Sequence, residues 1–283
     1  MAAIQMAAPN VNSLPSSVSK VTVGGALRSE FTKIRSVRST YWTLLVMIVL
    51  TVGLGAVASY GTTKSNQGPY FDPASWSLGG LVLTQLVIGV LGTLVITSEY
   101  STGMIRTSLA ALPQRGLLVG AKVAVFAAVA FVTGLISSFA SFFVGQAIMS
   151  PHHTNTTLSH PGVLRTVIGG ALFVTVCGLL ALGIGLLIRH TAGASSAVAA
   201  LLFVLPLLGN LLPHSLQNDV NKWLPTVAGA QIWTAVHPPH QNSASPLGTG
   251  GLMFAPWTGF AVFCGYAAIA IAAGLILFRK RDA

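Results

Sequence analysis

Charged side chains are scarce in this chain: only 7% of its 283 residues are Asp, Glu, Lys or Arg. A soluble globular domain carries about 25% charged residues, and so few charges would not cover the surface of a soluble protein of this size. Apolar residues make up 53% of the sequence, and its mean hydropathy is +0.74. The composition therefore excludes a soluble globular protein and predicts a membrane protein.

Motifs for chemistry are also missing. The two cysteines, Cys177 and Cys264, are too few for a disulfide framework or a cysteine-rich zinc site. No Gly-Lys-Ser/Thr triplet and no His-Glu-x-x-His motif occurs, so the sequence has neither a phosphate-binding P-loop nor that zinc motif. We therefore expect no enzyme activity, no cofactor and no resident metal in this chain.

Acidic residues are the rarer charge, and the formal net charge is +10. The 15 basic residues are scattered rather than gathered on one domain, so membrane topology explains them better than binding to nucleic acid. We expect no nucleic-acid partner.

Long apolar runs dominate what is present, and each can cross a hydrocarbon core of about 30 Å. They lack the alternation of a membrane β-barrel, which leaves helices as the spanning structure. Pro206 should kink the fifth run and leave a backbone carbonyl that needs another partner. The six predicted spans cover about 42–60, 78–97, 123–149, 166–188, 192–212 and 257–278.

An amphipathic segment precedes the first span. Apolar side chains recur at helical spacing over residues 21–40, with basic residues mostly on another face, which predicts a helix lying in the membrane interface. The residues expected to define this helix are Arg28, Phe31, Lys33, Arg35 and Arg38. Residues 1–20 have the composition of a disordered tail, which leaves 21–283 as the membrane domain.

The lysines and arginines predict the orientation. With both termini in the cytosol, only Lys64, Arg165 and Lys222 fall outside, and all other basic residues fall inside. The fold class predicted is an all-α membrane protein with six transmembrane helices, an N-terminal interfacial helix and both termini cytosolic.

Two connections stand out. In the cytosolic connection between the second and third spans, Ser101 is expected to cap a short helix that runs through Leu112 and stops at Pro113. The outer connection, residues 213–256, has apolar patches that are too short to span and could re-enter the outer leaflet.

The outer connections also carry six of the seven histidines, a set that could bind a metal ion or simply form a polar loop. These residues are His152, His153, His160, His214, His237 and His240.

Two stretches carry a family resemblance. The sequence LRSEFTKIRSVRSTYW, from Leu27 to Trp42, closely resembles the entry of actinobacterial permeases of the type-2 ABC transporter family, and EYSTGMIR, from Glu99 to Arg106, resembles their first cytosolic loop. Six spans with both ends inside match that fold too.

The resemblance implies a permease subunit of an ATP-driven exporter in the plasma membrane. Such a subunit forms a homodimer or heterodimer and works with separate ATPase subunits, which bind the ATP. The resemblance also implies that residues 99–115 couple the permease to the ATPase, with Glu99, Tyr100, Gly103, Arg106 and Arg115 as the candidate coupling residues.

Small residues at helical spacing are candidates for packing between the two halves of such a dimer, since they let helices approach closely. They are Gly55, Ser59, Ser196 and Ala200. Two alternatives stay open: a membrane channel or scaffold that works without ATP, and a metal-handling membrane protein that uses the outer histidines.

Overall fold

The computed structural model describes residues 22–64, 71–105, 114–234 and 254–280, and these contain helices and no strand. In chain order they are α1 (Val23–Ser36), α2 (Arg38–Thr63), α3 (Pro73–Ser77), α4 (Leu81–Ser101), α6 (Arg115–Met149), the 3-10 helix η2 (Ser150–His152), α7 (Val163–Ile188), α8 (Thr191–Ala199), the π-helix η3 (Ala200–Val204), α9 (Leu205–Gly209), α10 (His214–Asn221), α11 (Pro225–Ala230) and α12 (Pro256–Lys280).

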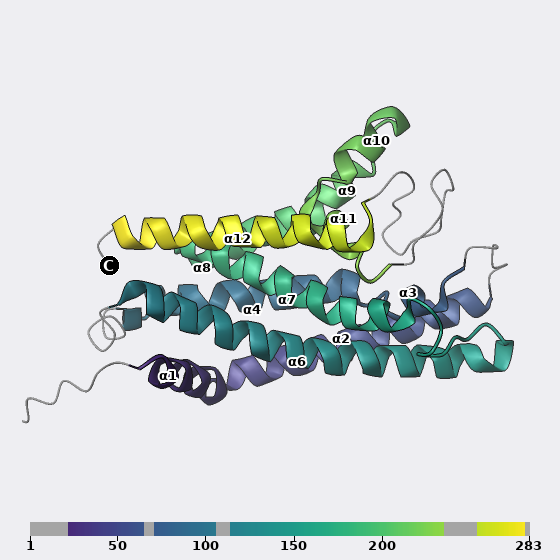
Figure 1. Cartoon of the computed structure of the whole chain (residues 1–283), viewed down its shortest axis with the longest axis horizontal. Coiled ribbons are helices and arrows are strands. Elements are labelled where there is room, and N and C mark those ends of the chain that lie inside the picture. The colour runs from purple at the N-terminus through teal and green to yellow at the C-terminus, as the bar shows by residue number, and fades with distance from the viewer. Residues whose placement is uncertain (1–21, 65–70, 106–113, 235–253, 281–283) are drawn as a thin grey trace, which may run out of the picture.

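Six helical stretches are long and apolar enough to cross a membrane, which confirms the predicted all-α, six-span class. They are α2, α4, α6 with η2, α7, the composite α8–η3–α9, and α12. The third begins at Arg115, two turns before the predicted start. Helix α1 and the last turn of α12 lie at the same end of the bundle (Figure 1), which we call the α1 end.

Helix α7 is the centre of the bundle and packs against α4, α6 and α12 (Figure 1). Buried residues make up 72% of its most apolar window, against 22% in α2 and α12. Glycines bring the central helices close, because a Cβ atom on Gly92 of α4 would lie 2.4 Å from the carbonyl oxygen of Gly178 in α7. Because so little of α2 and α12 is buried, these outer helices present apolar faces away from the bundle.

The amphipathic segment is shorter than expected. Thr22 caps α1 by accepting a hydrogen bond from the N–H of Gly25, and Val37 is extended, with φ −88° and ψ 111°. This extended residue ends α1 at Ser36, so the predicted helix over residues 21–40 is broken there. Arg38, expected on the interfacial helix, instead opens α2.

The fifth span is broken as Pro206 predicts. The π-helix η3 ends at Val204, two residues before Pro206. The missing N–H of Pro206 leaves the carbonyl of Leu202 without its usual helical donor. Thr226 of α11 supplies the replacement, since its hydroxyl donates to the Leu202 oxygen at 3.0 Å. The expectation that this carbonyl needs another partner is confirmed.

The apolar part of the outer connection packs into the bundle. Every residue of α11 is buried, and the helix contacts α12, α7 and η3. The guanidinium of Arg165 in α7 donates to the carbonyl oxygens of Gln231 at 3.2 Å, Ile232 at 3.0 Å and Thr234 at 3.1 Å. This cation therefore satisfies the carbonyls that follow α11 and holds the segment on α7.

Candidate functional site at the α1 end

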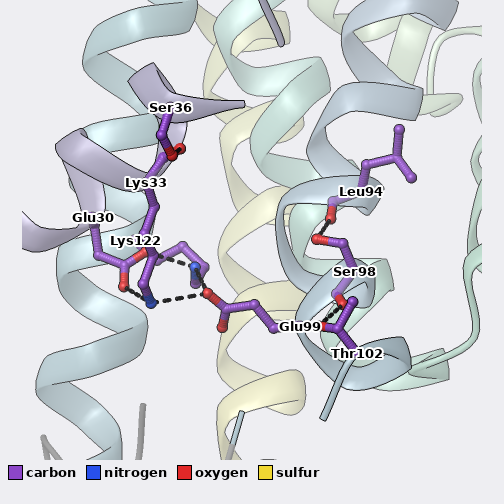
Figure 2. A network of polar contacts seen from close by, with 8 residues as sticks. All are labelled: Glu30, Lys33, Ser36, Leu94, Ser98, Glu99, Thr102 and Lys122. Atoms are coloured by element: carbon purple, nitrogen blue, oxygen red, sulfur yellow. Dashed lines mark hydrogen bonds and ion pairs between the residues drawn. The ribbon is translucent and has the colours of Figure 1, made fainter. Parts of the chain in front are cut away.

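Four charged side chains from three helices meet inside the α1 end (Figure 2). Lys122 of α6 donates to Glu30 of α1 at 2.6 Å and to Glu99 of α4 at 2.8 Å. Lys33 of α1 donates to the same two carboxylates, at 2.8 Å to Glu30 and 3.1 Å to Glu99. We call Glu30, Lys33, Glu99 and Lys122 the charge cluster; it joins α1, α4 and α6.

The charge cluster is nearly closed to solvent. The side chains of Glu30, Lys122 and Glu99 are 1%, 3% and 7% exposed, and only Lys33, at 30%, reaches the surface. Two lysines balance two glutamates, and these are the only glutamates in the sequence. Buried charges are costly without such pairing, so removing a single member leaves an uncompensated charge.

The paired charges shift each other's ionisation. Burial alone would raise the pKa of Glu30, but the attraction and hydrogen bonds of Lys122 and Lys33 hold it below its ordinary value. Burial alone would lower the pKa of Lys33, but its hydrogen bond to Glu30 and the charge of Glu99 raise it above its ordinary value. Both groups are therefore held in their charged forms.

A second set of contacts closes the same end against α12. The guanidinium of Arg115, at the start of α6, donates to the carbonyl oxygens of Phe278 at 2.9 Å and Arg279 at 3.3 Å. Tyr100 packs edge-on against Phe278, with ring centroids 6.5 Å apart, and the guanidinium of Arg189 lies 5.1 Å from the centre of the Tyr100 ring. Arg189, which follows α7, also donates to the carbonyl oxygen of Leu277 at 3.3 Å. The end of α12 is thereby fixed to α4, α6 and the end of α7.

The turn after α4 differs from the expected helix start. Ser101 is the last residue of α4, and its hydroxyl donates to the carbonyl of Ser98 rather than capping a following helix. Gly103 is exposed and has a φ of +70°, a left-handed conformation that glycine adopts without strain. Arg106, and the predicted helix as far as Pro113, lie outside the described residues except for the first few positions.

Comparison with known families assigns the chain. Residues 26–206, well over half of the sequence, match the family described as ABC-2 family transporter protein. The chain belongs to this ABC-2 family. The match runs from α1 through Pro206, so it includes the whole charge cluster and ends within the broken fifth span. No curated protein matches the chain.

In this ABC-2 permease, the residues expected to couple it to another subunit do not all lie on the surface. Glu99 and Tyr100 point into the bundle, and Arg115 contacts α12. These three residues therefore fix the end of α4 and the start of α6, the two helices that flank the 106–113 connection. Gly103 alone of the described candidates is exposed at the turn.

Sequence reasoning missed three participants in these contacts. Glu30 and Lys122 complete the charge cluster, and Arg189 covers Tyr100. In the topology prediction, Lys122 counts only as one of the cytosolic positive charges. The rarity of glutamate could have indicated them. The chain has two glutamates, both next to one end of its apolar spans, and charged residues that are this rare in a membrane protein often have a specific role.

The residues expected to pack between two permease halves separate into two groups. Gly55 and Ser59 are buried within one chain: a Cβ atom on Gly55 would lie 2.3 Å from the carbonyl oxygen of Ser77 in α3. Ser196 and Ala200, one turn apart on the fifth span, are exposed and remain candidates for contact with a second chain.

The predicted interfacial residues also divide. Arg28, Phe31 and Arg35 lie on the exposed surface of α1, whereas Lys33 turns inward to the charge cluster.

Among the described residues, His152, His153 and His160 are exposed, and no group of three or more His, Cys, Asp or Glu side chains has the arrangement of a metal site. His214 opens α10, and His237 and His240 lie outside the described residues.

Proposed function

We propose that this ABC-2 permease is the membrane subunit of an ATP-driven exporter. In this account two permease chains, identical or different, form the pathway, and separate ATPase subunits bind the ATP. The absence of a P-loop motif from the sequence supports a separate source of ATP hydrolysis.

We place the permease in the plasma membrane, with the α1 end facing the cytosol. The ATPase subunits bind at this end. Basic residues support this orientation. Arg28, Arg35 and Arg115 lie at the α1 end with other lysines and arginines, while the far end holds only Lys64, Arg165 and Lys222 among the described residues.

The observation that carries the proposal is that the helix ends on both sides of the 106–113 connection are fixed. The end of α4 is joined to α1 and α6 through Glu99, and the start of α6 is joined to α12 through Arg115. A displacement of the connection by a closing ATPase dimer would therefore move α1, α4, α6 and α12 together. Such rigid coupling lets one event shift the spans between two states.

In this mechanism Glu99, Tyr100 and Arg115 are positioning residues that transmit motion. Contact with the ATPase falls to the connection itself, including Arg106, and to the turn before it, which contains Gly103. The second permease half packs against the exposed face of the fifth span that carries Ser196 and Ala200, where small side chains permit close approach.

Affinity purification from native membranes tests the proposal. A P-loop ATPase should co-purify with the intact chain and be lost when residues 106–113 are replaced by a Gly/Ser segment of equal length. The matched control replaces residues 154–159, a connection at the far end, and should retain the ATPase. Membrane fractionation checks that both variants insert. The proposal fails if the intact chain brings down no ATPase, or if the 106–113 replacement retains it.

A further inference from the structure

Three arginines at the α1 end have no acidic partner within the described chain. Arg28 and Arg35 on α1 and Arg38 at the start of α2 are exposed, and none takes part in an ion pair. Both glutamates are committed to the charge cluster, and the two described aspartates lie at the cap of α3 and on α10. Among the described residues, therefore, no carboxylate is left to pair with these arginines.

We propose that α1 and the first turn of α2 bind the headgroups of anionic phospholipids, with Arg28, Arg35 and Arg38 contacting the phosphates. None of these arginines belongs to the charge cluster, and the site does not depend on the proposed ATPase partner. Its occupant is the membrane leaflet at the α1 end.

The order of side chains around α1 fits a membrane interface. At about 3.6 residues per turn, Val23 and Phe31 define an apolar strip, Arg28 and Arg35 follow it, and the hydroxyl of Thr32 lies beyond the arginines. Val23 is 60% exposed and Phe31 is 50% exposed, so packing against the rest of the described chain leaves the strip accessible. An apolar strip beside arginines matches the boundary between acyl chains and headgroups.

The opposite side of α1 fixes its rotation. Ala26 and Glu30 are buried against the bundle, and Lys33 reaches the charge cluster. Since α1 is held along this side, the helix cannot turn its arginines away from the surface without breaking the cluster. The arginine face is therefore presented in a defined direction.

Aromatic residues mark the same level on the next helix. Tyr41 and Trp42 follow Arg38 within one turn of α2, and they are 54% and 68% exposed. Exposed Tyr and Trp near the end of a span favour the headgroup region, where the ring is apolar and its polar atom is hydrated. With these rings in the headgroup region, Arg38 would lie beside the phosphates.

A shallow recess on α1 adds hydrogen-bond donors for a headgroup. It has a volume of about 430 Å³ and is lined by polar or small residues: Gly25, Arg28, Ser29, Thr32, Lys33 and Ser36. A guanidinium beside hydroxyls suits a phosphate or a glycerol headgroup. The exposed apolar strip of Val23 and Phe31, on the other side of the arginines, favours a lipid over an acidic protein surface, because these side chains would gain by entering the acyl region.

Lipid titration of the purified full chain tests the site. Native mass spectrometry gives the affinity for phosphatidylglycerol and for phosphatidylcholine, each added separately in the same detergent. Arg28→Gln with Arg35→Gln should lower the affinity for phosphatidylglycerol about fivefold for each arginine, and so about 25-fold for the pair. The affinity for phosphatidylcholine should stay the same. The matched control, Lys64→Gln with Lys222→Gln, removes two charges from the far end and should leave both affinities unchanged.

Salt provides a second measurement on the unaltered chain, which does not depend on the variants folding. Added salt should weaken phosphatidylglycerol binding, because exposed charges are screened. The proposal is overturned if the arginine pair can be removed without loss of phosphatidylglycerol affinity, if the control loses as much, or if the unaltered chain prefers neither lipid. Loss of a co-purifying ATPase with unchanged lipid affinity would assign the arginines to a protein partner and also overturn it.

Discussion

Lys122→Met is the substitution expected to damage the bundle most directly. Methionine keeps most of the length of the side chain and removes its charge. Glu30 and Glu99 then share only Lys33, which approaches Glu99 at 3.1 Å, the longest of the four ion-pair distances in the cluster. The two carboxylates also lose most of the attraction that offset their burial.

The expected cost follows from the burial of the pair. Breaking a buried ion pair by removing one partner costs about 3–5 kcal/mol, because the remaining charge is left uncompensated. Lys33 still neutralises part of that charge, so we expect the lower end, about 3 kcal/mol. Lys64→Met is the matched control: Lys64 is exposed and 4.7 Å above the Tyr60 ring, which predicts a loss below about 1 kcal/mol.

A double-mutant cycle separates charge balance from packing. Adding Glu99→Gln to Lys122→Met restores one lysine to one glutamate, so the double variant should be more stable than the sum of the two single losses predicts, by about 1–3 kcal/mol. Unfolding free energies come from SDS titration in mixed micelles, followed by tryptophan fluorescence. Strict additivity, or a Lys122→Met variant within about 1 kcal/mol of the unaltered chain, would refute the charge cluster as a stabilising element.

Three further predictions concern pH, the broken span and the central helix pair. The folded chain favours ionised Glu30, so the contribution of Glu30 to the unfolding free energy is complete above its ordinary pKa of 4.5 and is lost as the pH falls through its lower pKa in the folded chain. In unfolding titrations, the stability of the unaltered chain should therefore fall more steeply in acid than that of Glu30→Gln. Thr226→Val should cost about 1–3 kcal/mol in the same titrations by leaving the Leu202 carbonyl unsatisfied, and equal stability of Thr226→Ser and Thr226→Val would contradict this. Gly92→Ala should cost about 1–3 kcal/mol, while Gly120→Ala, whose Cβ would meet no atom within 4 Å, should cost nothing; similar losses would refute close backbone packing.

The spans were predictable because hydropathy is local. A run of about 20 apolar residues can cross the hydrocarbon core whatever its neighbours are, so six runs predict six helices. The break at Pro206 is local as well, since proline removes a specific donor. The donor that replaces it, Thr226, lies in a different element, and no pattern in the sequence indicates that the two meet.

The charge cluster could not be predicted for the same reason. Glu30 and Lys122 are 92 positions apart, and they meet only because α1 packs against α6. Loop charges count toward topology wherever they point, so the positive-inside rule gives no information on whether Lys122 is solvated or buried. The family resemblance includes Glu99, but only the packing shows that its carboxylate faces the bundle.

Photo-crosslinking in the native membrane tests the central claim most directly. A photoreactive amino acid at position 108, in the connection between α4 and α6, should form an adduct with a P-loop ATPase. The same group at position 160, in the exposed connection at the far end, should form none. An ATPase adduct from position 160 rather than 108, or no ATPase adduct from either, would contradict the account of the α1 end as the ATPase-binding side.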